Sequence, residues 1–244
     1  MRKQLQECRV LIVGVGGLGC PVALHLASAG IGTLVLIDPD TVELSNLNRQ
    51  VLHRTSAIGT PKVVSAAARL AALYPALCVE VYCERLTAAN APRLFSGVDF
   101  VVDATDGIAA KFLINDAAVA CGRPYSHAGV LGFLGQTLTV LCGRSACLRC
   151  VFPEPPPADT APTCQEAGIV GAVAGVIGAA QAGEAIKYLR GEGSLLTDRL
   201  LTFDALAGRW RILTLSRNLR CPCCGASTDS AAASSKPRAE VAGG

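Results

Sequence analysis

The sequence lacks any run of lysines and arginines, and its 244 residues carry a formal net charge of only +3. Because nucleic-acid-binding surfaces concentrate basic side chains on one face, we expect no nucleic-acid partner. Residues 1–7 contain no apolar signal core, which favours a cytoplasmic, reduced protein. The apolar run over residues 169–180 has 12 residues. A membrane-spanning helix needs about 20, so we expect a buried helix and no membrane.

Charged residues are also scarce, at 17% of the chain, whereas apolar residues make up 51%. This balance argues against a largely disordered chain and allows one large domain with a small appendage. The 12 cysteines do not indicate a disulfide scaffold, because such scaffolds are typical of short secreted chains. In a reduced protein some cysteines should be metal ligands or nucleophiles, and the others small core residues.

Short apolar runs of strand character alternate with helical patterns along the chain. This alternation predicts an α/β fold of the Rossmann-like, doubly wound class, with a mostly parallel sheet between two layers of helices. Two late runs across a turn at Gly208 predict additional antiparallel strands. The predicted strands span residues 9–13, 33–37, 77–83, 98–102, 124–126, 136–141, 200–203 and 210–213, and the predicted helices span residues 18–29, 61–74, 108–120 and 171–189.

A glycine-rich segment follows the first predicted strand and opens a helix, as a nucleotide-binding loop requires. Glycines let the backbone turn tightly and approach phosphate groups, which bind N–H groups at the helix N-terminus. Asp38 ends the next strand, 24 residues after the first of these glycines, where a carboxylate can bind a ribose hydroxyl. A tight turn without a ligand is the alternative for this segment. The glycines are Gly14, Gly16, Gly17 and Gly19.

Two basic residues and a carboxylate follow at positions where they can converge on the same pocket. Arg49 lies in a polar loop after the second strand, and Lys62 lies at a predicted helix start. Together they suit a triphosphate, whose charge develops further as pyrophosphate leaves. Asp106 ends another strand on the same edge, where a carboxylate can hold Mg²⁺ against phosphate oxygens. The alternatives are solvated surface charges for the basic pair, and Asp103 in place of Asp106, with turn capping as its structural role.

Two C-x-x-C pairs, Cys147 with Cys150 and Cys221 with Cys224, have the spacing of a tetrahedral zinc site. They predict a structural zinc that ties the C-terminal segment onto the main domain. Cys223 is an alternative to one of its neighbours as a ligand. A redox dithiol is the weaker alternative for each pair.

Cys164 follows a proline-rich segment and precedes a predicted helix, where the helix N-terminus lowers a thiol pKa. It is a candidate nucleophile that attacks an activated acyl group or carries a persulfide. A packed or spare cysteine is the alternative. The three histidines show no metal-binding spacing, and we expect His25 to be packed in its helix.

Together these motifs resemble those of the ThiF/MoeB/HesA family, relatives of the ubiquitin-activating enzymes. The resemblance runs from about residue 9 to residue 225 and implies adenylation. In that reaction the C-terminal Gly-Gly carboxylate of a small ubiquitin-like sulfur-carrier protein attacks the α-phosphate of ATP and releases pyrophosphate. A homodimer is also implied, and a cysteine desulfurase or other sulfur donor is a candidate partner. The motifs are the four-glycine loop, residues 38–42 and 45–50, Gly59 with Lys62, residues 104–106, both cysteine pairs, and Thr163 with Cys164.

Matched position by position, the resemblance implies a role for each site residue and the cofactors ATP, Mg²⁺ and Zn²⁺. Asp38 would bind the ribose, and Asp40 belongs to the same set of nucleotide-binding residues. The phosphates would be bound by Asn46, Arg49 and Lys62, and Mg²⁺ by Asp106. Cys164 would act in later sulfur or acyl transfer. The expected organisation is an adenylyltransferase domain over residues 1–215 with a crossover loop at about 153–163, a zinc segment over 216–225 that closes onto 147–150, and a disordered tail over 226–244.

One family feature is missing before the first strand. Relatives carry an N-terminal arm with an Arg-Tyr-x-Arg-Gln segment whose arginine reaches the partner subunit's ATP, whereas eight residues without that segment precede the strand here. Arg2 is the candidate substitute, on a tether to Arg9 of at most about 25 Å when extended; a truncated chain and slower catalysis are the alternatives. Two other functions compete: a nucleotide-binding scaffold with weakened turnover, and an NAD-dependent Rossmann oxidoreductase, which would leave Arg49 and Lys62 without a role.

Overall fold

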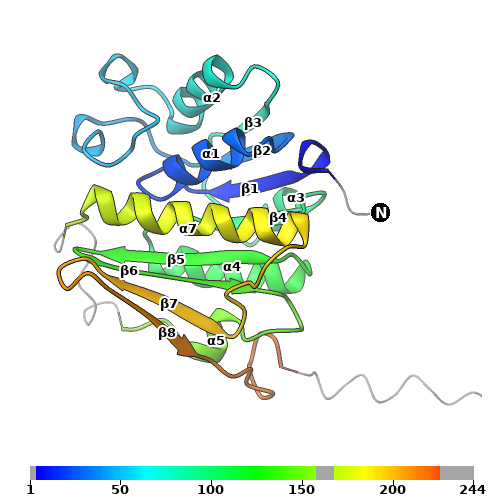
Figure 1. The fold of residues 1–244 in the computed structure, drawn as a ribbon. Helices are drawn as coiled ribbons and strands as arrows, with labels where there is room; N and C mark the ends of the chain where they lie inside the picture. The colour runs from blue at the N-terminus through cyan, green and yellow to red at the C-terminus, as the bar shows by residue number, and fades with distance from the viewer. Residues whose placement is uncertain (1–3, 158–167, 226–244) are drawn as a thin grey trace, which may run out of the picture.

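The computed structural model describes residues 4–157 and 168–225. The strands of this part of the chain form one eight-stranded sheet, in the order β3-β2-β1-β4-β5-β6-β7-β8 (Figure 1). Strands β1 to β5 are parallel, and β6 to β8 continue the sheet antiparallel. Their bounds are β1 (Arg9–Val13), β2 (Thr33–Ile37), β3 (Cys78–Tyr82), β4 (Phe100–Asp103), β5 (Tyr125–Leu131), β6 (Leu134–Val140), β7 (Arg199–Asp204) and β8 (Arg209–Thr214).

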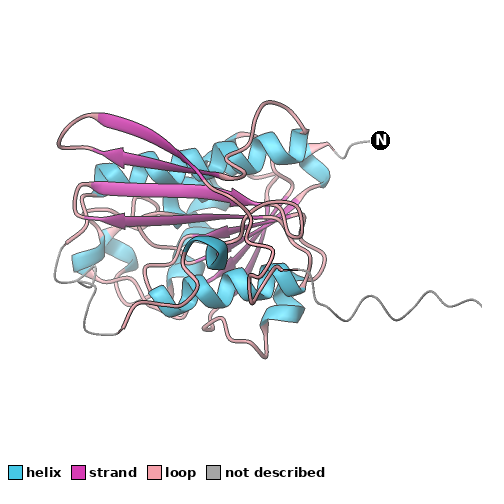
Figure 2. Cartoon of the chain, turned by 90° about the horizontal axis from the view of Figure 1, so that it is seen from below, coloured by secondary structure: helices cyan, strands magenta, loops and turns pink. Residues whose placement is uncertain are grey.

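Helices cover both faces of the sheet, as the view from below shows (Figure 2). One apolar cluster joins α1 (Gly19–Ser28), α2 (Lys62–Leu73) and α7 (Gly171–Arg190) to one face. A second cluster joins α3 (Ala91–Phe95) and α4 (Ile108–Ala120) to the other face, beside α5 (Leu148–Val151). Among the described residues, none of these helices combines the length and apolar character needed to cross a bilayer.

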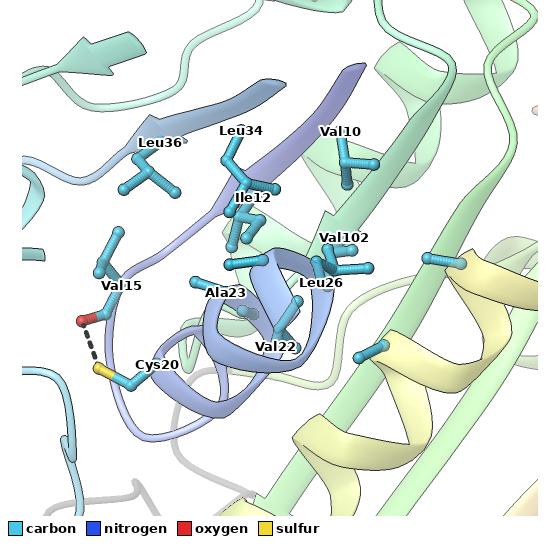
Figure 3. Packing of buried hydrophobic residues seen from close by; sticks show 14 of the residues in the cluster. Val10, Ile12, Val15, Cys20, Val22, Ala23, Leu26, Leu34, Leu36 and Val102 are labelled. Carbon is cyan, nitrogen blue, oxygen red and sulfur yellow. Dashed lines mark hydrogen bonds between the residues drawn. The ribbon is translucent and has the colours of Figure 1, made fainter. Parts of the chain in front are cut away.

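The central strands are apolar on both faces because helices bury both sides of a parallel sheet. In β1 and β2 all residues after the first are buried, and all of β4 is buried. On the α1 face, strand residues meet helix residues in one layer (Figure 3). Burying a large aliphatic side chain contributes about 1.5–3 kcal/mol, so this layer fixes α1 and the loop before it. The labelled strand residues are Val10, Ile12, Leu34, Leu36 and Val102, and the labelled helix residues are Cys20, Val22, Ala23 and Leu26.

The fold class predicted from the sequence is confirmed, and the differences lie at the ends of elements, in two short helices and in the exposure of His25. The helix predicted to begin at Pro61 begins at Lys62, with Pro61 as its N-cap. The strand predicted over residues 124–126 extends to Leu131 because it pairs with β6 along its full length. The short helices α3 and α5 were not predicted, and His25 is exposed rather than packed.

The chain before β1 is docked on the body of the molecule. Residues Leu5–Glu7 form a short 3₁₀ helix, and the Leu5 carbonyl accepts a hydrogen bond from the Gly32 N–H at 3.0 Å. A Cβ atom on Gly32 would lie 1.8 Å from the Gln6 carbonyl oxygen, so only glycine permits this approach. The part of the tether from Leu5 to Arg9 is therefore fixed against the body of the molecule.

Candidate functional site

The predicted nucleotide-binding residues lie at the carboxyl ends of the parallel strands. From β1 the sheet grows through β2 and β3 on one side and through β4 and β5 on the other, so the strand order reverses between β1 and β4. Ligands of open α/β sheets bind at such a reversal, outside the carboxyl ends of the strands. The glycine loop follows β1, Asp38 follows β2, and residues 104–106 follow β4, so all three motifs meet there.

The four glycines of the loop have two different tasks. Gly14 has φ +94°, and a Cβ there would lie 2.7 Å from the Ala104 carbonyl oxygen. A Cβ on Gly19 would lie 2.0 Å from the Gly14 carbonyl oxygen. Gly16 and Gly17 meet no such backbone obstacle and are partly exposed. The first two glycines are therefore needed for the loop to close, and the other two leave its outer side open to a ligand.

Asp38 holds the loop and remains able to accept another hydrogen bond. One carboxylate oxygen accepts the Val15 N–H at 2.7 Å, and the other accepts the Asp40 N–H at 2.9 Å. Burial raises the pKa of Asp38, and these two N–H donors oppose the rise. Because a carboxylate has about four acceptor positions, two remain for a ligand hydroxyl.

Lys62 is the first residue of α2, and its side chain is 9% exposed. Its Nζ lies 2.9 Å from an oxygen of Asp40, whose side chain is 57% exposed. The Lys62 N–H also donates to the Asp40 carbonyl oxygen at 2.9 Å, which fixes the helix start against the loop. The structure thus brings together two residues of the predicted set, and a phosphate arriving at this point would meet a cation already held in place.

Arg49 lies beside the glycine loop, because its Cγ would be 3.5 Å from a Cβ on Gly17. The exposed guanidinium donates through Nη1 to the Ser45 carbonyl and to Asn48 Oδ1, each at 3.0 Å. Asn46 is buried, and its Oδ1 accepts the Glu43 N–H at 3.3 Å, so this residue shapes its own loop. These contacts hold Arg49 at the loop while its head group stays at the surface.

The two carboxylates after β4 differ in exposure. Asp106 is exposed in the turn that leads into α4. Asp103 is fully buried, and it accepts hydrogen bonds from Thr105 N at 3.1 Å and Thr105 Oγ1 at 2.7 Å. Asp103 therefore caps the turn, which is the structural role given as the alternative to metal binding. Asp106 is the carboxylate that faces solvent at this edge.

Sequence reasoning missed two polar residues behind the loop. His53 is buried, with Nδ1 3.0 Å from Ser65 Oγ and Nε2 3.1 Å from the Val15 carbonyl oxygen. Since a carbonyl can only accept, His53 donates from Nε2, and burial lowers its pKa and keeps the ring neutral. Gln50 is also buried, and its Oε1 has no partner within the described ranges. Nothing in the local pattern around His53 signals this contact, whereas Gln50 lies in the quoted polar segment.

The two cysteine pairs form one cluster. The Sγ atoms of Cys147 and Cys221 are 3.6 Å apart, those of Cys150 and Cys224 are 3.4 Å apart, and all four lie within 4.8 Å of one another. Thiolates 2.3 Å from a tetrahedral zinc ion lie about 3.8 Å apart, so these residues fit zinc. Burial alone would raise the pKa of Cys221, but N–H groups of Cys224 and Cys223 help to lower it to about 7. A thiol that ionises this readily is suited to metal binding.

Cys223 lies outside the cluster. Its sulfur accepts a hydrogen bond from Asn115 Nδ2 at 3.2 Å, and burial raises its pKa to about 12. Asn115 also accepts the Leu148 N–H at 2.9 Å, so one residue of α4 contacts a residue inside each C-x-x-C segment. Arg149 and Asp116 add a bidentate ion pair with both distances 2.7 Å. The cluster is therefore anchored on α4.

Four parts of the sequence-based prediction lie wholly or partly outside the described residues. Cys164, Arg2 and the tail over residues 226–244 all belong to the undescribed ranges, as does the crossover loop from residue 158 onward. Their predicted roles stay predictions.

Comparison with known proteins places this geometry beside characterised enzymes. The ThiF family model matches residues 1–223. The chain is 43% identical over 229 residues to the sulfur carrier protein adenylyltransferase of Thermus thermophilus, covering 92% of this chain and 84% of that protein. It is 46% identical over 223 residues to the adenylyltransferase and sulfurtransferase MOCS3 of Sus scrofa, covering 91% of this chain and 49% of that one. The chain thus spans about half the length of this MOCS3 relative.

Solved structures show the same fold. Crystal structures of E. coli MccB alone and of MccB with ATP match with TM-scores of 0.82 and 0.78, at 21% and 22% identity. Each match covers 91% of this chain and 66% or 68% of the MccB chain, respectively. At this identity the likeness concerns the fold alone.

Proposed function

Because the chain belongs to the ThiF family, we propose that it is an adenylyltransferase that activates the C-terminal Gly-Gly carboxylate of a small ubiquitin-like sulfur-carrier protein with ATP. The observation that carries the proposal is the convergence of the glycine loop, Asp38, Lys62 and Asp106 on one edge of the sheet. The names of the relatives support it, since both act as adenylyltransferases.

In the proposed reaction a carboxylate oxygen of the carrier attacks the α-phosphorus of ATP. An acyl–phosphate bond forms, the bond between the α-phosphorus and the bridging oxygen to the β-phosphate breaks, and pyrophosphate leaves with the electron pair. The loop amides at Gly16 and Gly17 would bind phosphate oxygens, and Asp38 would accept a ribose hydroxyl. These contacts orient the α-phosphorus before the carrier tail arrives.

Charge control is the second task of the site. Lys62 would leave Asp40 for the phosphates, while Arg49 would turn from the Ser45 carbonyl toward the leaving pyrophosphate. Asp106 would hold Mg²⁺, which neutralises phosphate charge when bound. Attack is favoured because positive charge surrounds the oxygens on which negative charge develops.

The remaining assignments extend the same proposal. Cys147, Cys150, Cys221 and Cys224 would bind one structural zinc that fastens residues 216–225 to residues 147–150, outside the adenylation chemistry. Cys164 would act after adenylation, in sulfur or acyl transfer, with a sulfur donor such as a cysteine desulfurase. The working unit would be a homodimer in the cytoplasm.

ATP–pyrophosphate exchange tests this function. With a Gly-Gly-ending carrier protein, an adenylyltransferase returns labelled pyrophosphate to ATP, and a carrier shortened by its last two residues serves as the control. A scaffold binds ATP without exchange, and a dehydrogenase binds NAD in preference to ATP. If the protein binds ATP but shows no exchange with carriers from several pathways, the nucleotide-binding scaffold is the correct function and the enzyme is not.

A further inference from the structure

A buried charge cluster lies beneath the turn that carries Asp106. Lys111 of α4 has a side chain that is 11% exposed, and its Nζ lies 3.4 Å from an Asp103 carboxylate oxygen. The same Nζ donates to the Thr105 carbonyl oxygen at 2.6 Å and to the Ala128 carbonyl oxygen at 2.5 Å. An ammonium group has three N–H donors, so these three partners use all of them. Lys111 therefore has no donor left for a phosphate.

His127 completes the cluster from β5. Its Nδ1 lies 2.9 Å from Asp103 Oδ2, the same oxygen that Lys111 approaches, and the ring is 3% exposed. Burial lowers the pKa of His127, so the neutral ring donates from Nδ1 to the carboxylate. Burial would raise the pKa of Asp103, but Lys111, His127 and Thr105 hold it below its usual value. Asp103 thus stays ionised beneath the turn.

The cluster fixes Thr105 at both ends. The Thr105 N–H and hydroxyl are bound to Asp103, and its carbonyl is bound to Lys111. Because Thr105 directly precedes Asp106, the backbone that carries the exposed carboxylate cannot shift without breaking these contacts. A buried ion pair contributes little net stability compared with apolar residues of similar volume. Stability alone therefore does not account for a lysine here.

We propose that Lys111, acting with Asp103 and His127, is a positioning residue that holds the Thr105–Asp106 turn in the geometry needed for Mg²⁺–ATP. This inference rests on the proposed function, because it assumes that Asp106 holds the metal. Lys111 itself does not touch substrate; it acts through the backbone of Thr105.

The test measures the Mg²⁺ concentration that half-saturates ATP binding by calorimetry, together with the same midpoint in the exchange reaction. Lys111→Met keeps the length of the side chain but removes its charge and donors. Residues that orient a metal ligand typically change metal affinity or activity about 10–100-fold, and we expect the midpoint to rise by that factor. Lys111→Arg, which keeps charge and donors, should recover much of the loss.

Lys187→Met is the matched control. Lys187 on α7 also pairs with a buried carboxylate, Glu184, and donates to a backbone carbonyl, that of Ser194, at 2.7 Å. Its loss should lower thermal stability without moving the Mg²⁺ midpoint. A Lys111→Met protein that only melts earlier, with an unchanged midpoint, overturns the proposal.

Thr105→Val covers the case in which Lys111→Met does not fold. It removes one hydrogen bond to Asp103 without burying an unpaired charge, and it should raise the midpoint in the same direction. An unchanged midpoint in folded Thr105→Val then contradicts the inference. The binding readout separates this result from failure of the proposed function, because wild-type ATP binding can depend on Mg²⁺ even if no exchange occurs. Wild-type ATP binding that is independent of Mg²⁺ overturns the inference by itself.

Discussion

At the scale of single residues, the most specific expectation concerns Asp103 and Asp106, which are three positions apart in the sequence and lie in opposite environments. Asp103 is fully buried and accepts hydrogen bonds from Thr105, whereas Asp106 is exposed. Both were candidate metal ligands from the sequence, and Asp106 was the preferred one. Their separation depends on where β4 ends and on the partners Lys111 and His127, which no local pattern reveals.

We predict that Asp106→Ala and Arg49→Ala each lower carrier-dependent exchange by about 10²–10³-fold, because each removes charge stabilisation from the transition state. Circular dichroism and thermal melting should stay close to wild type, since Asp106 is exposed and the half-buried Arg49 makes its hydrogen bonds at the exposed end of its side chain. Arg54→Ala, an exposed arginine on the same segment, and Asp204→Ala, at the distant β7–β8 turn, are the controls. An unaffected rate in Asp106→Ala would remove the metal assignment.

Cys164 should have a separable effect. We predict that Cys164→Ala forms the acyl-adenylate at the wild-type rate, because no thiol is needed when a carboxylate attacks ATP. Transfer of sulfur or of the acyl group to a thiol should be lost, as detected by mass spectrometry of the carrier. Loss of adenylate formation in a folded Cys164→Ala protein would place the thiol in the first step instead.

At the scale of elements, the sequence predicts best where a pattern repeats. The apolar runs that became β1, β2 and β4 are long enough to identify strands, and glycines and prolines mark their ends. The helices α3 and α5 have five and four residues, too few to show a helical period. The α3 and α5 segments are held by the sheet and the cysteine cluster rather than by their own propensity.

The same limit applies to the site. The glycines and Asp38 have characteristic spacings, so their convergence at the nucleotide site could be predicted from the sequence. The spacing within the two cysteine pairs likewise predicts that they form one metal site. The pairing of Lys62 with Asp40 and the contact of His53 with the loop join residues 22 and 38 positions apart, and only the fold brings them together.

We predict one zinc ion per chain, bound by the four clustered cysteines. The double variant Cys221→Ser/Cys224→Ser should lose zinc in elemental analysis and melt well below wild type, since structural zinc contributes on the order of 10 kcal/mol. Cys223→Ser is the matched control and should keep its zinc, because its sulfur contacts Asn115 rather than the cluster. Full zinc content in the double variant would rule out the clasp.

At the scale of the whole molecule, the N-terminal segment bears on whether Arg2 supplies an arginine to the ATP site of a partner subunit. Leu5 is docked against Gly32, and β1 leads from this end of the sheet toward the site at its other end (Figure 1). An arginine supplied by a partner subunit can be worth about 10³–10⁵ in phosphoryl transfer. Arg2 lies outside the described residues, so its reach toward a partner's site stays a prediction.

We predict a homodimer by light scattering that binds ATP well and exchanges pyrophosphate slowly unless Arg2 contributes, and Arg2→Ala is the variant that tests this contribution. Lys3→Ala is the neighbouring control. If Arg2→Ala lowers the rate by 10²-fold or more with unchanged ATP affinity, Arg2 replaces the family arm after all.

In the proposed function, a carrier carboxylate is activated with ATP at the site on the edge of the sheet between β1 and β4. The most direct measurement is exchange of labelled pyrophosphate into ATP by wild-type protein, with an intact Gly-Gly-ending carrier and with the same carrier shortened by two residues. We predict Mg²⁺-dependent exchange with the intact carrier alone, and its loss in Asp106→Ala. Tight ATP binding without exchange across carriers of several pathways, or equal exchange with the shortened carrier, would contradict the account.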